Sequence, residues 1–132
     1  MSPGWCLLTA CLLASNVLGD DEDDEAYQRI FDDIDVDTVL NNDRVLDSYI
    51  HCFIDTGPCS DLAAEIKGRI SEILGTVCGS CTEKQKGIFK HSLEVFIPKR
   101  TNEWKRILEI YDPKGEAEPK IMDFLKTWTL KE

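Results

Sequence analysis

The sequence predicts an all-α fold, a compact bundle of about six short helices. From about residue 36 to the C-terminus, apolar residues recur at the i, i+3, i+4 spacing of helices, and the alternating pattern of strands is scarce. The breaks between these segments are short, so neighbouring helices are expected to pack closely. A chain of 132 residues is the size of one small domain with one modest core.

The first two helices are predicted from their N-caps and their apolar faces. A short helix is expected around Val36–Leu40, with Asp35 as its candidate N-cap. Asn42 or Asp43 begins the second helix, and the Gly-Pro pair at 57–58 stops it. The apolar face of this second helix consists of Val45, Leu46, Tyr49, Ile50 and Phe53.

The next two helices are also marked by capping residues. Ser60 is the candidate N-cap of the third helix, and Gly75 marks its fraying end. Thr82 and Gln85 have the spacing of a capping box that opens the fourth helix, which Pro98 should end or kink. The apolar stripe of the third helix is Leu62, Ile66, Ile70, Ile73 and Val77. That of the fourth is Ile88, Phe89, Leu93, Phe96 and Ile97.

The last two helices complete the predicted bundle. Thr101 is expected to cap the fifth helix, and the Asp-Pro pair at 112–113 should close it. Its inward positions are Trp104, Ile107, Leu108 and Tyr111. The sixth helix should start near Pro119 and bury Ile121, Phe124, Leu125 and Trp128.

Residues 1–19 have the pattern of a secretory signal peptide. They carry no charged side chain, contain an apolar run through Leu13, and place small side chains at Val17 and Gly19, before a cleavage site after about Gly19. The apolar run is shorter than the roughly 20 residues that a transmembrane helix needs. The protein is therefore expected to be secreted and extracellular, without stable membrane insertion.

Residues 20–30 are predicted to be an acidic, disordered leader that precedes a helical domain at 31–132. Between residues 20 and 37 there are ten acidic residues and one base, Arg29, which accounts for most of the net charge of −10. Such a run is typical of a solvated tail, and docking onto a basic partner is the alternative. The rest of the chain has no basic stripe, so nucleic acid is not an expected partner.

Four cysteines remain once the signal peptide is removed. An even number in a small secreted chain predicts two disulfides, formed by Cys52, Cys59, Cys78 and Cys81. Chain entropy does not choose among the three pairings, because it gives about 2.5 and about 1.9 kcal/mol for the two local loops and about 3.5 kcal/mol for a long one. The local pairs flank turns that the fold must make anyway, which favours them.

The Cys-Gly-Ser-Cys stretch at 78–81 also raises two other chemistries. A thioredoxin-type site needs a preceding strand, but a predicted helix precedes Cys78 and there is no βαβ pattern. A zinc site needs a second pair at similar spacing, and the other two cysteines are six residues apart. Catalytic redox chemistry is retained only as a third hypothesis.

The sequence indicates neither a metal site nor catalysis. The acidic residues at 33–37 suggest the start of an EF-hand, but Thr38 and Arg44 stand where that loop needs glycine and glutamate. His51 and His91 lack a carboxylate or nucleophile at a recognisable spacing. No enzyme activity, cofactor or metal is therefore expected.

The cysteine spacing C-x6-C-x18-C-x2-C, followed by the sequence CTEKQK, resembles the insect chemosensory proteins, the OS-D or A10 family. Further matches are DIDVDTVLNNDRVLDSYIHC at 33–52, DTGPC at 55–59 and NEWKRILEIYDP at 102–113. The resemblance implies disulfides Cys52–Cys59 and Cys78–Cys81. It also implies a hydrophobic channel between the helices that takes long-chain fatty acids, alcohols, esters or semiochemicals.

The resemblance and the apolar stripes together give a predicted ligand site. The resemblance implies roles for Tyr49 and Trp104, with Gln85 as a polar group near the channel, while Phe31 stands where the family commonly has Tyr. The complete predicted set is Phe31, Tyr49, Phe53, Ile66, Ile70, Gln85, Ile88, Trp104, Ile107, Leu108 and Ile121.

Two hypotheses of function follow. In the first, a monomeric, non-catalytic carrier binds small hydrophobic molecules in its core, as such channels in helical bundles do. In the second, an extracellular signalling or developmental protein acts through an unidentified protein partner. A ligand that stabilises the folded chain favours the first hypothesis.

Overall fold

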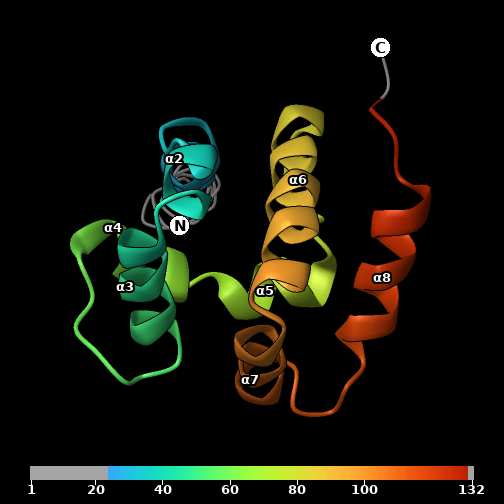
Figure 1. The fold of residues 1–132 in the computed structure, drawn as a ribbon. Helices are drawn as coiled ribbons and strands as arrows, with labels where there is room; N and C mark the ends of the chain where they lie inside the picture. Colours follow the sequence, from blue (N-terminus) through green and yellow to red (C-terminus); the bar gives the residue numbers. More distant parts are fainter. Residues whose placement is uncertain (1–23, 131–132) are drawn as a thin grey trace, which may run out of the picture.

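The computed structural model describes residues 24–130 (Figure 1). Within this range the fold is helical without strands, which confirms the all-α class. The predicted signal peptide at 1–19 and the first four residues of the acidic leader lie outside the described residues. In chain order the elements are η1 (Gln28–Asp32, a π-helical turn), α2 (Val36–Leu40), α3 (Asp43–Phe53), α4 (Asp61–Lys67), α5 (Ile70–Thr76), α6 (Glu83–Lys99), α7 (Thr101–Tyr111) and α8 (Ala117–Thr127).

Four predicted N-caps are confirmed by hydrogen bonds. In each case the side-chain oxygen accepts a backbone N–H three residues later, which satisfies one of the open donors of the first turn. The capping residues are Asp35 in α2, Asn42 in α3, Ser60 in α4 and Thr82 in α6. At α6 the reciprocal bond from the Thr82 N–H to Gln85 Oε1, 2.9 Å long, completes the capping box.

The predicted disordered leader must be corrected, because residues 24–32 are helical. Tyr27 and Ile30 are 3% and 5% exposed, and Phe31 is buried beside them. The Tyr27 hydroxyl donates to Glu72 over 2.9 Å, and Arg29 binds Glu65. These apolar residues stand at i, i+3 and i+4, so the segment buries one face of a helix. The many acidic residues around them make the composition of the segment look like that of a solvated tail.

The predicted third helix is two helices, α4 and α5. The break falls at Gly68 and Arg69, and Arg69 has φ −110° and ψ −3°. Glycine has the weakest helix propensity apart from proline, which favours the break at this position. The apolar stripe continues across it, so the period alone does not reveal the turn.

The predicted junction between the fourth and fifth helices is correct to within two residues. The helix α6 runs through Pro98 and ends at Lys99. Proline has no backbone N–H, so it cannot donate a helical hydrogen bond, and a helix end close to it is expected. Thr101 is the first residue of α7 and not its N-cap, which is Arg100. The Thr101 hydroxyl instead donates to the Ile97 carbonyl over 2.9 Å.

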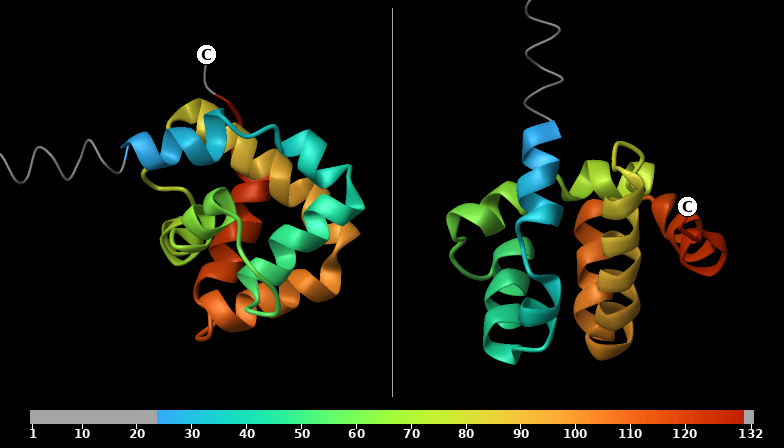
Figure 2. Two further views of the ribbon diagram at one scale, coloured as in Figure 1. Left: turned by 90° about the vertical axis from the view of Figure 1, so that its left-hand side faces the viewer. Right: turned by 90° about the horizontal axis from the view of Figure 1, so that it is seen from above.

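The helices form two groups that face each other, with α2, α3 and α4 on one side and α6, α7 and α8 on the other (Figure 1). Helix α2 packs against α3 and α6, α3 against α4, and α6 against α7, while α8 packs on α5 and α6 (Figure 1). The segment at 24–32 lies between α4 and α6, as the right-hand panel of Figure 2 shows. No helix within residues 24–130 combines the length and hydropathy of a membrane span.

Both disulfides are local, as expected. Cys52 is bonded to Cys59 and Cys78 to Cys81, with Cα–Cα distances of 4.9 and 5.2 Å. The first closes the turn between α3 and α4, and the second closes the corner between α5 and α6. Each bridge therefore restrains the connection between two successive helices.

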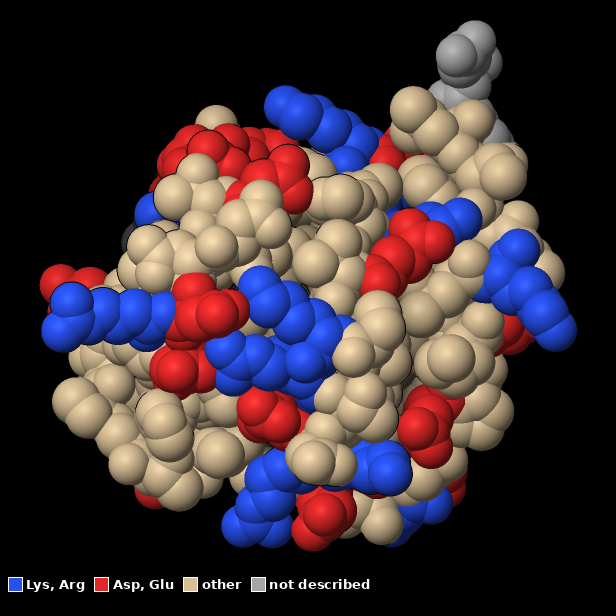
Figure 3. Space-filling view, viewed as in Figure 1, with Lys and Arg blue, Asp and Glu red and all other residues tan. Residues whose placement is uncertain are grey.

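A charged cluster joins the α2–α3 pair to the α6–α7 corner. Arg100 Nη1 lies 2.5 Å from Asp47 and 3.3 Å from Glu103. Lys99 Nζ donates to the Leu40 carbonyl over 2.6 Å and lies 3.1 Å from Asp43. On the face of the molecule in Figure 3, lysines and arginines are interspersed with acidic residues and form no extended patch of one sign.

Removing the first disulfide should weaken the fold measurably. In a Cys52→Ala/Cys59→Ala variant, the chain-entropy model predicts a loss of about 2.5 kcal/mol in the free energy of unfolding. Urea unfolding of the variant beside the oxidised wild type measures the loss. An unchanged free energy would show that the turn is fixed by its other contacts.

Acid should weaken the contact between Lys99 and Asp43. The hydrogen bond and charge of Lys99, together with Arg100, lower the pKa of Asp43 below the ordinary value of 3.8. A lowered folded-state pKa stabilises the fold above the unfolded value, and the contribution disappears as the pH falls through the folded one. The difference in Tm between the wild type and Lys99→Met should therefore be largest near neutral pH and should shrink below about pH 3.8.

A matched control separates this contact from general charge effects. Lys105 lies on α7, is exposed, and makes no ion pair with the described residues. Lys105→Met should therefore give a small Tm difference that varies little with pH. The same acid dependence in both variants would contradict the assignment to Asp43.

Candidate functional site

A cavity of about 220 Å³ lies between the two groups of helices. Its walls come from every described element before α8, including the segment that contains η1. The lining residues are Ile30, Phe31, Ile34, Val36, Val39, Leu40, Leu46, Tyr49, Ile50, Phe53, Ile66, Ile70, Ile73, Leu74, Phe89, Ser92, Leu93, Phe96, Trp104 and Ile107.

The lining is almost entirely apolar. Only three lining residues have a polar side-chain atom, namely Tyr49, Ser92 and Trp104. The Ser92 hydroxyl donates to the Ile88 carbonyl over 2.7 Å. Among the described residues, neither the Tyr49 hydroxyl nor the Trp104 indole N–H is a buried polar atom left without a partner. With no charged lining residue, the cavity suits an apolar molecule that has few polar groups.

Hydrogen bonds outside the cavity hold its aromatic walls in place. The Tyr111 hydroxyl donates to the carbonyl of Phe53 over 2.6 Å and so anchors the end of α3. Burial raises the pKa of Tyr111, which keeps this hydroxyl protonated. Across the cavity, the rings of Phe96 and Trp104 meet edge to face with centroids 6.4 Å apart.

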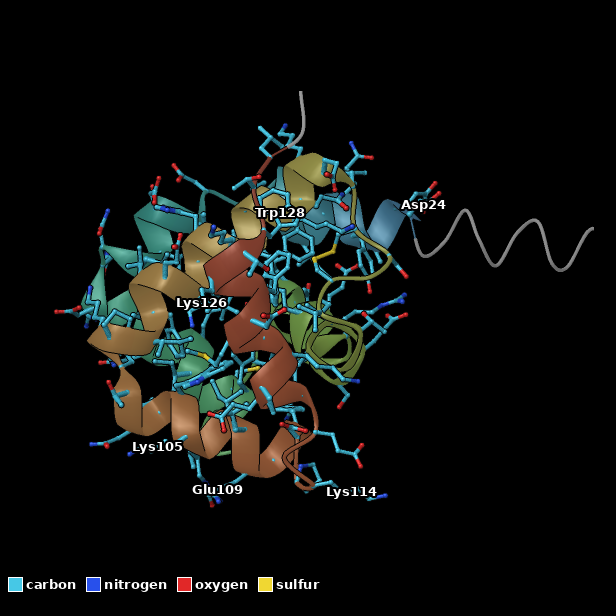
Figure 4. All side chains as sticks on the ribbon, turned by 90° about the vertical axis from the view of Figure 1, so that its right-hand side faces the viewer. Asp24, Lys105, Glu109, Lys114, Lys126 and Trp128 are labelled. Carbon is cyan, nitrogen blue, oxygen red and sulfur yellow. A yellow bond between two sulfur atoms is a disulfide. The ribbon has the colours of Figure 1, made fainter. Side chains whose placement is uncertain are left out.

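The helix α8 contributes nothing to the cavity lining. Its buried face packs against α5 and α6, and Trp128 stacks on Phe124 with ring centroids 5.5 Å apart. Figure 4 shows Trp128 at the C-terminal end of α8, beside the start of α6. A Cβ at Gly87 would lie 3.8 Å from this ring, an ordinary van der Waals distance, so the start of α6 and the ring are close neighbours. The helix therefore covers the outer side of the wall.

Seven of the predicted site residues line the cavity. They are Phe31, Tyr49, Phe53, Ile66, Ile70, Trp104 and Ile107. They come from five different segments of the chain, and the fold brings them around one space. Ligand contact stays a prediction for each of them.

The structure does not bring the other four predicted residues to the cavity. The Gln85 side chain is hydrogen-bonded elsewhere. Its Oε1 accepts from the Thr82 N–H in the capping box, and its Nε2 donates to Asp32 over 3.2 Å. Ile88, Leu108 and Ile121 pack in other parts of the core. Each lies on a predicted apolar stripe. The stripes of α6 and α7 are wide enough to face two neighbouring elements, so Ile88 and Leu108 can be inward without reaching the cavity. Ile121 belongs to α8, which does not line the cavity.

Several lining residues were not among the predicted ligand contacts. Most stand on stripes that were predicted to face inward, such as Leu46, Ile50 and Leu93. Ile30 was placed in the leader, although its spacing to Phe31 and Ile34 is helical. Ser92 gave no signal, because one serine in an amphipathic helix is usually exposed.

The described residues contain no group of three or more potential metal ligands. The two histidines make surface contacts. His51 shares a hydrogen bond of 2.7 Å with Thr56, and His91 lies 2.6 Å from Asp37. Both pairs are exposed and lie outside the cavity lining.

Comparison with known proteins now identifies the family. Residues 27–119 match the insect pheromone-binding family A10/OS-D. The chain belongs to this family. The match covers the cavity and both disulfides, and it confirms the resemblance that the cysteine spacing indicated.

Individual A10/OS-D relatives agree with this. The chain is 38% identical over 92 residues to odorant-binding protein A10 of Drosophila melanogaster, a match that covers 70% of this chain and 59% of that protein. It is 33% identical over 103 residues to allergen Tha p 1 of Thaumetopoea pityocampa, covering 78% and 82% of the two chains. The chain thus spans about 59% of the A10 protein's length.

A solved structure shares the fold. It is a chemosensory protein in complex with bromo-dodecanol, with 30% sequence identity and a TM-score of 0.64. The match covers 74% of this chain and 97% of that one.

The cavity should accept a larger side chain without loss of stability. In Val39→Phe the ring can enter the cavity, so the unfolding free energy should stay within about 1 kcal/mol of wild type. In Ile121→Phe the same ring must enter a fully buried site outside the cavity, which should cost about 1–3 kcal/mol. Urea unfolding compares the two, and equal losses would contradict open space beside Val39.

Proposed function

We propose that this A10/OS-D protein is a secreted, non-catalytic carrier that binds one small hydrophobic molecule in its cavity. The observation that carries the proposal is the lining, in which 17 of 20 residues have purely hydrocarbon side chains. An aliphatic ligand that removes such a surface from water lowers the free energy of the system, which favours binding. The related chemosensory protein in complex with bromo-dodecanol supports this ligand class.

The cavity favours slender, weakly polar ligands. A volume of about 220 Å³ lies just below the roughly 300–1,000 Å³ typical of small-molecule sites. A fatty-acid carboxylate would find no cation in the lining, and an unpaired buried charge is costly. Long-chain alcohols and esters therefore suit the interior better than ionised fatty acids, whose carboxylates would have to remain at the surface.

Catalysis is not part of the proposal. Ser92 is the one aliphatic hydroxyl in the lining, and no histidine or carboxylate lines the cavity to activate it. The two disulfides are typical of an oxidising compartment, which supports secretion. They also leave the CGSC stretch without free thiols in the oxidised protein.

Aliphatic alcohols of graded length should displace a fluorescent fatty probe from the oxidised protein. Each additional CH2 that is buried contributes about 0.8 kcal/mol, or roughly fourfold in affinity, until the chain outgrows the cavity. A ligand at 100 times its Kd should also raise the unfolding free energy by about 2.7 kcal/mol. Fluorescence titration and thermal melts measure the two effects.

A blocked variant tests whether the cavity is the binding site. Val39→Phe should abolish displacement while the protein stays folded. Val45→Phe is the matched control, because Val45 lies on α3 outside the lining. If the folded wild type takes up neither probe nor alcohol, the carrier proposal fails, and the alternative of an extracellular protein that acts through a protein partner takes its place.

A further inference from the structure

We propose that Ser92 selects the polar end of the ligand, and that it favours a head group able to donate a hydrogen bond, such as a primary alcohol. This inference rests on the proposed carrier function and names the ligand class of the same cavity. It concerns the one lining residue that is polar and not aromatic.

Ser92 is a serine among apolar lining residues. It lies on α6 between Phe89 and Phe96, both of which line the cavity with it. Its hydroxyl donates to the Ile88 carbonyl one turn earlier, over 2.7 Å. A serine hydroxyl has one hydrogen to donate and two lone pairs that accept. The bond to Ile88 uses the hydrogen, so toward a ligand the Ser92 hydroxyl can act only as an acceptor.

An acceptor in this place distinguishes between ligand head groups. An alcohol can donate its hydroxyl hydrogen to Ser92 Oγ while the bond to Ile88 is kept. That bond polarises the serine hydroxyl, which makes the oxygen a better acceptor. An ether, ester or aldehyde offers only lone pairs, so it can pair with Ser92 only if the bond to the helix backbone is broken. The bond lost to the Ile88 carbonyl then offsets the bond gained to the ligand, although that carbonyl keeps its backbone hydrogen bond within α6.

The other two polar groups of the lining do not make this distinction. The Trp104 indole N–H is a donor only, so it pairs with an ether as readily as with an alcohol. The Tyr49 hydroxyl belongs to a lining residue and can donate or accept according to the ligand. Discrimination between donating and accepting head groups is therefore assigned to Ser92.

A pair of isomeric ligands tests this assignment. 1-Decanol and methyl nonyl ether have the same atoms and similar length, but only the alcohol can donate a hydrogen bond. Both are titrated against a fluorescent fatty probe bound to the oxidised wild type and to Ser92→Ala. The alcohol-to-ether affinity ratio should fall about tenfold in the variant, because the alcohol loses its acceptor and the ether loses nothing.

Three further variants serve as controls. Ser92→Thr keeps an oxygen that can bond the carbonyl four residues earlier, so the ratio should remain near the wild-type value. Tyr49→Phe and Trp104→Phe should change both affinities by similar factors and leave the ratio within about twofold. Using a ratio cancels the effects of each substitution on cavity size and stability.

The outcomes separate this inference from the proposed function. Binding of both isomers with an unchanged ratio in Ser92→Ala overturns the role of Ser92 and leaves the carrier function standing. Loss of the ratio in Tyr49→Phe instead reassigns it to Tyr49 and overturns the inference in the same way. If neither isomer displaces the probe from the folded wild type, the carrier function fails and the inference with it.

Discussion

A small chain that keeps a cavity in its core must hold the walls apart by contacts at their edges. Here the α2–α3 pair faces α6 and α7 across the cavity. At one end, Lys99 and Arg100 tie the two groups through Asp43 and Asp47. At the other, the segment at 24–32 bridges α4 and α6. The space between the walls contributes little packing energy, so these edge contacts and the two disulfides carry more of the stability than they would in a filled core.

The segment at 24–32 shows why sequence reasoning succeeded for most of the chain and failed at its start. Caps such as Thr82 and Asn42 are local, because one side chain and a backbone N–H three residues away determine them. These caps were therefore predicted correctly from the sequence. Tyr27, Ile30 and Phe31 have an equally regular spacing, but charge dominates the composition around them. Arg29 and Tyr27 find acids on α4 and α5, and no local pattern reveals those long-range partners.

An apolar cavity was expected from the sequence, but only seven of the residues predicted for it line it. The reason again is that the deciding contacts are long-range. Helical periodicity identifies the residues that face inward and does not say which of them face open space. Trp104 and Leu108 occupy the same stripe of α7, yet Trp104 lines the cavity and Leu108 does not. Gln85 has the burial of a site residue, but its hydrogen bonds belong to the capping box and to Asp32. The direction of a side chain toward a cavity is a tertiary property that depends on how the helices cross.

The lining combines hydrocarbon walls with one aliphatic hydroxyl, that of Ser92. The walls determine how tightly a ligand binds, and the hydroxyl affects which ligand is selected. The hydrocarbon walls contribute a free energy that grows with buried area, and many aliphatic chains satisfy them equally well. A buried polar atom contributes little net free energy when paired, but it penalises any ligand that leaves it unpaired or breaks a bond it already makes. One hydroxyl on α6 can therefore change which head group is accepted without changing how strongly the chain is held. A cavity lined by many polar groups would lose this property, because each would demand its own partner and narrow the range of chains that bind.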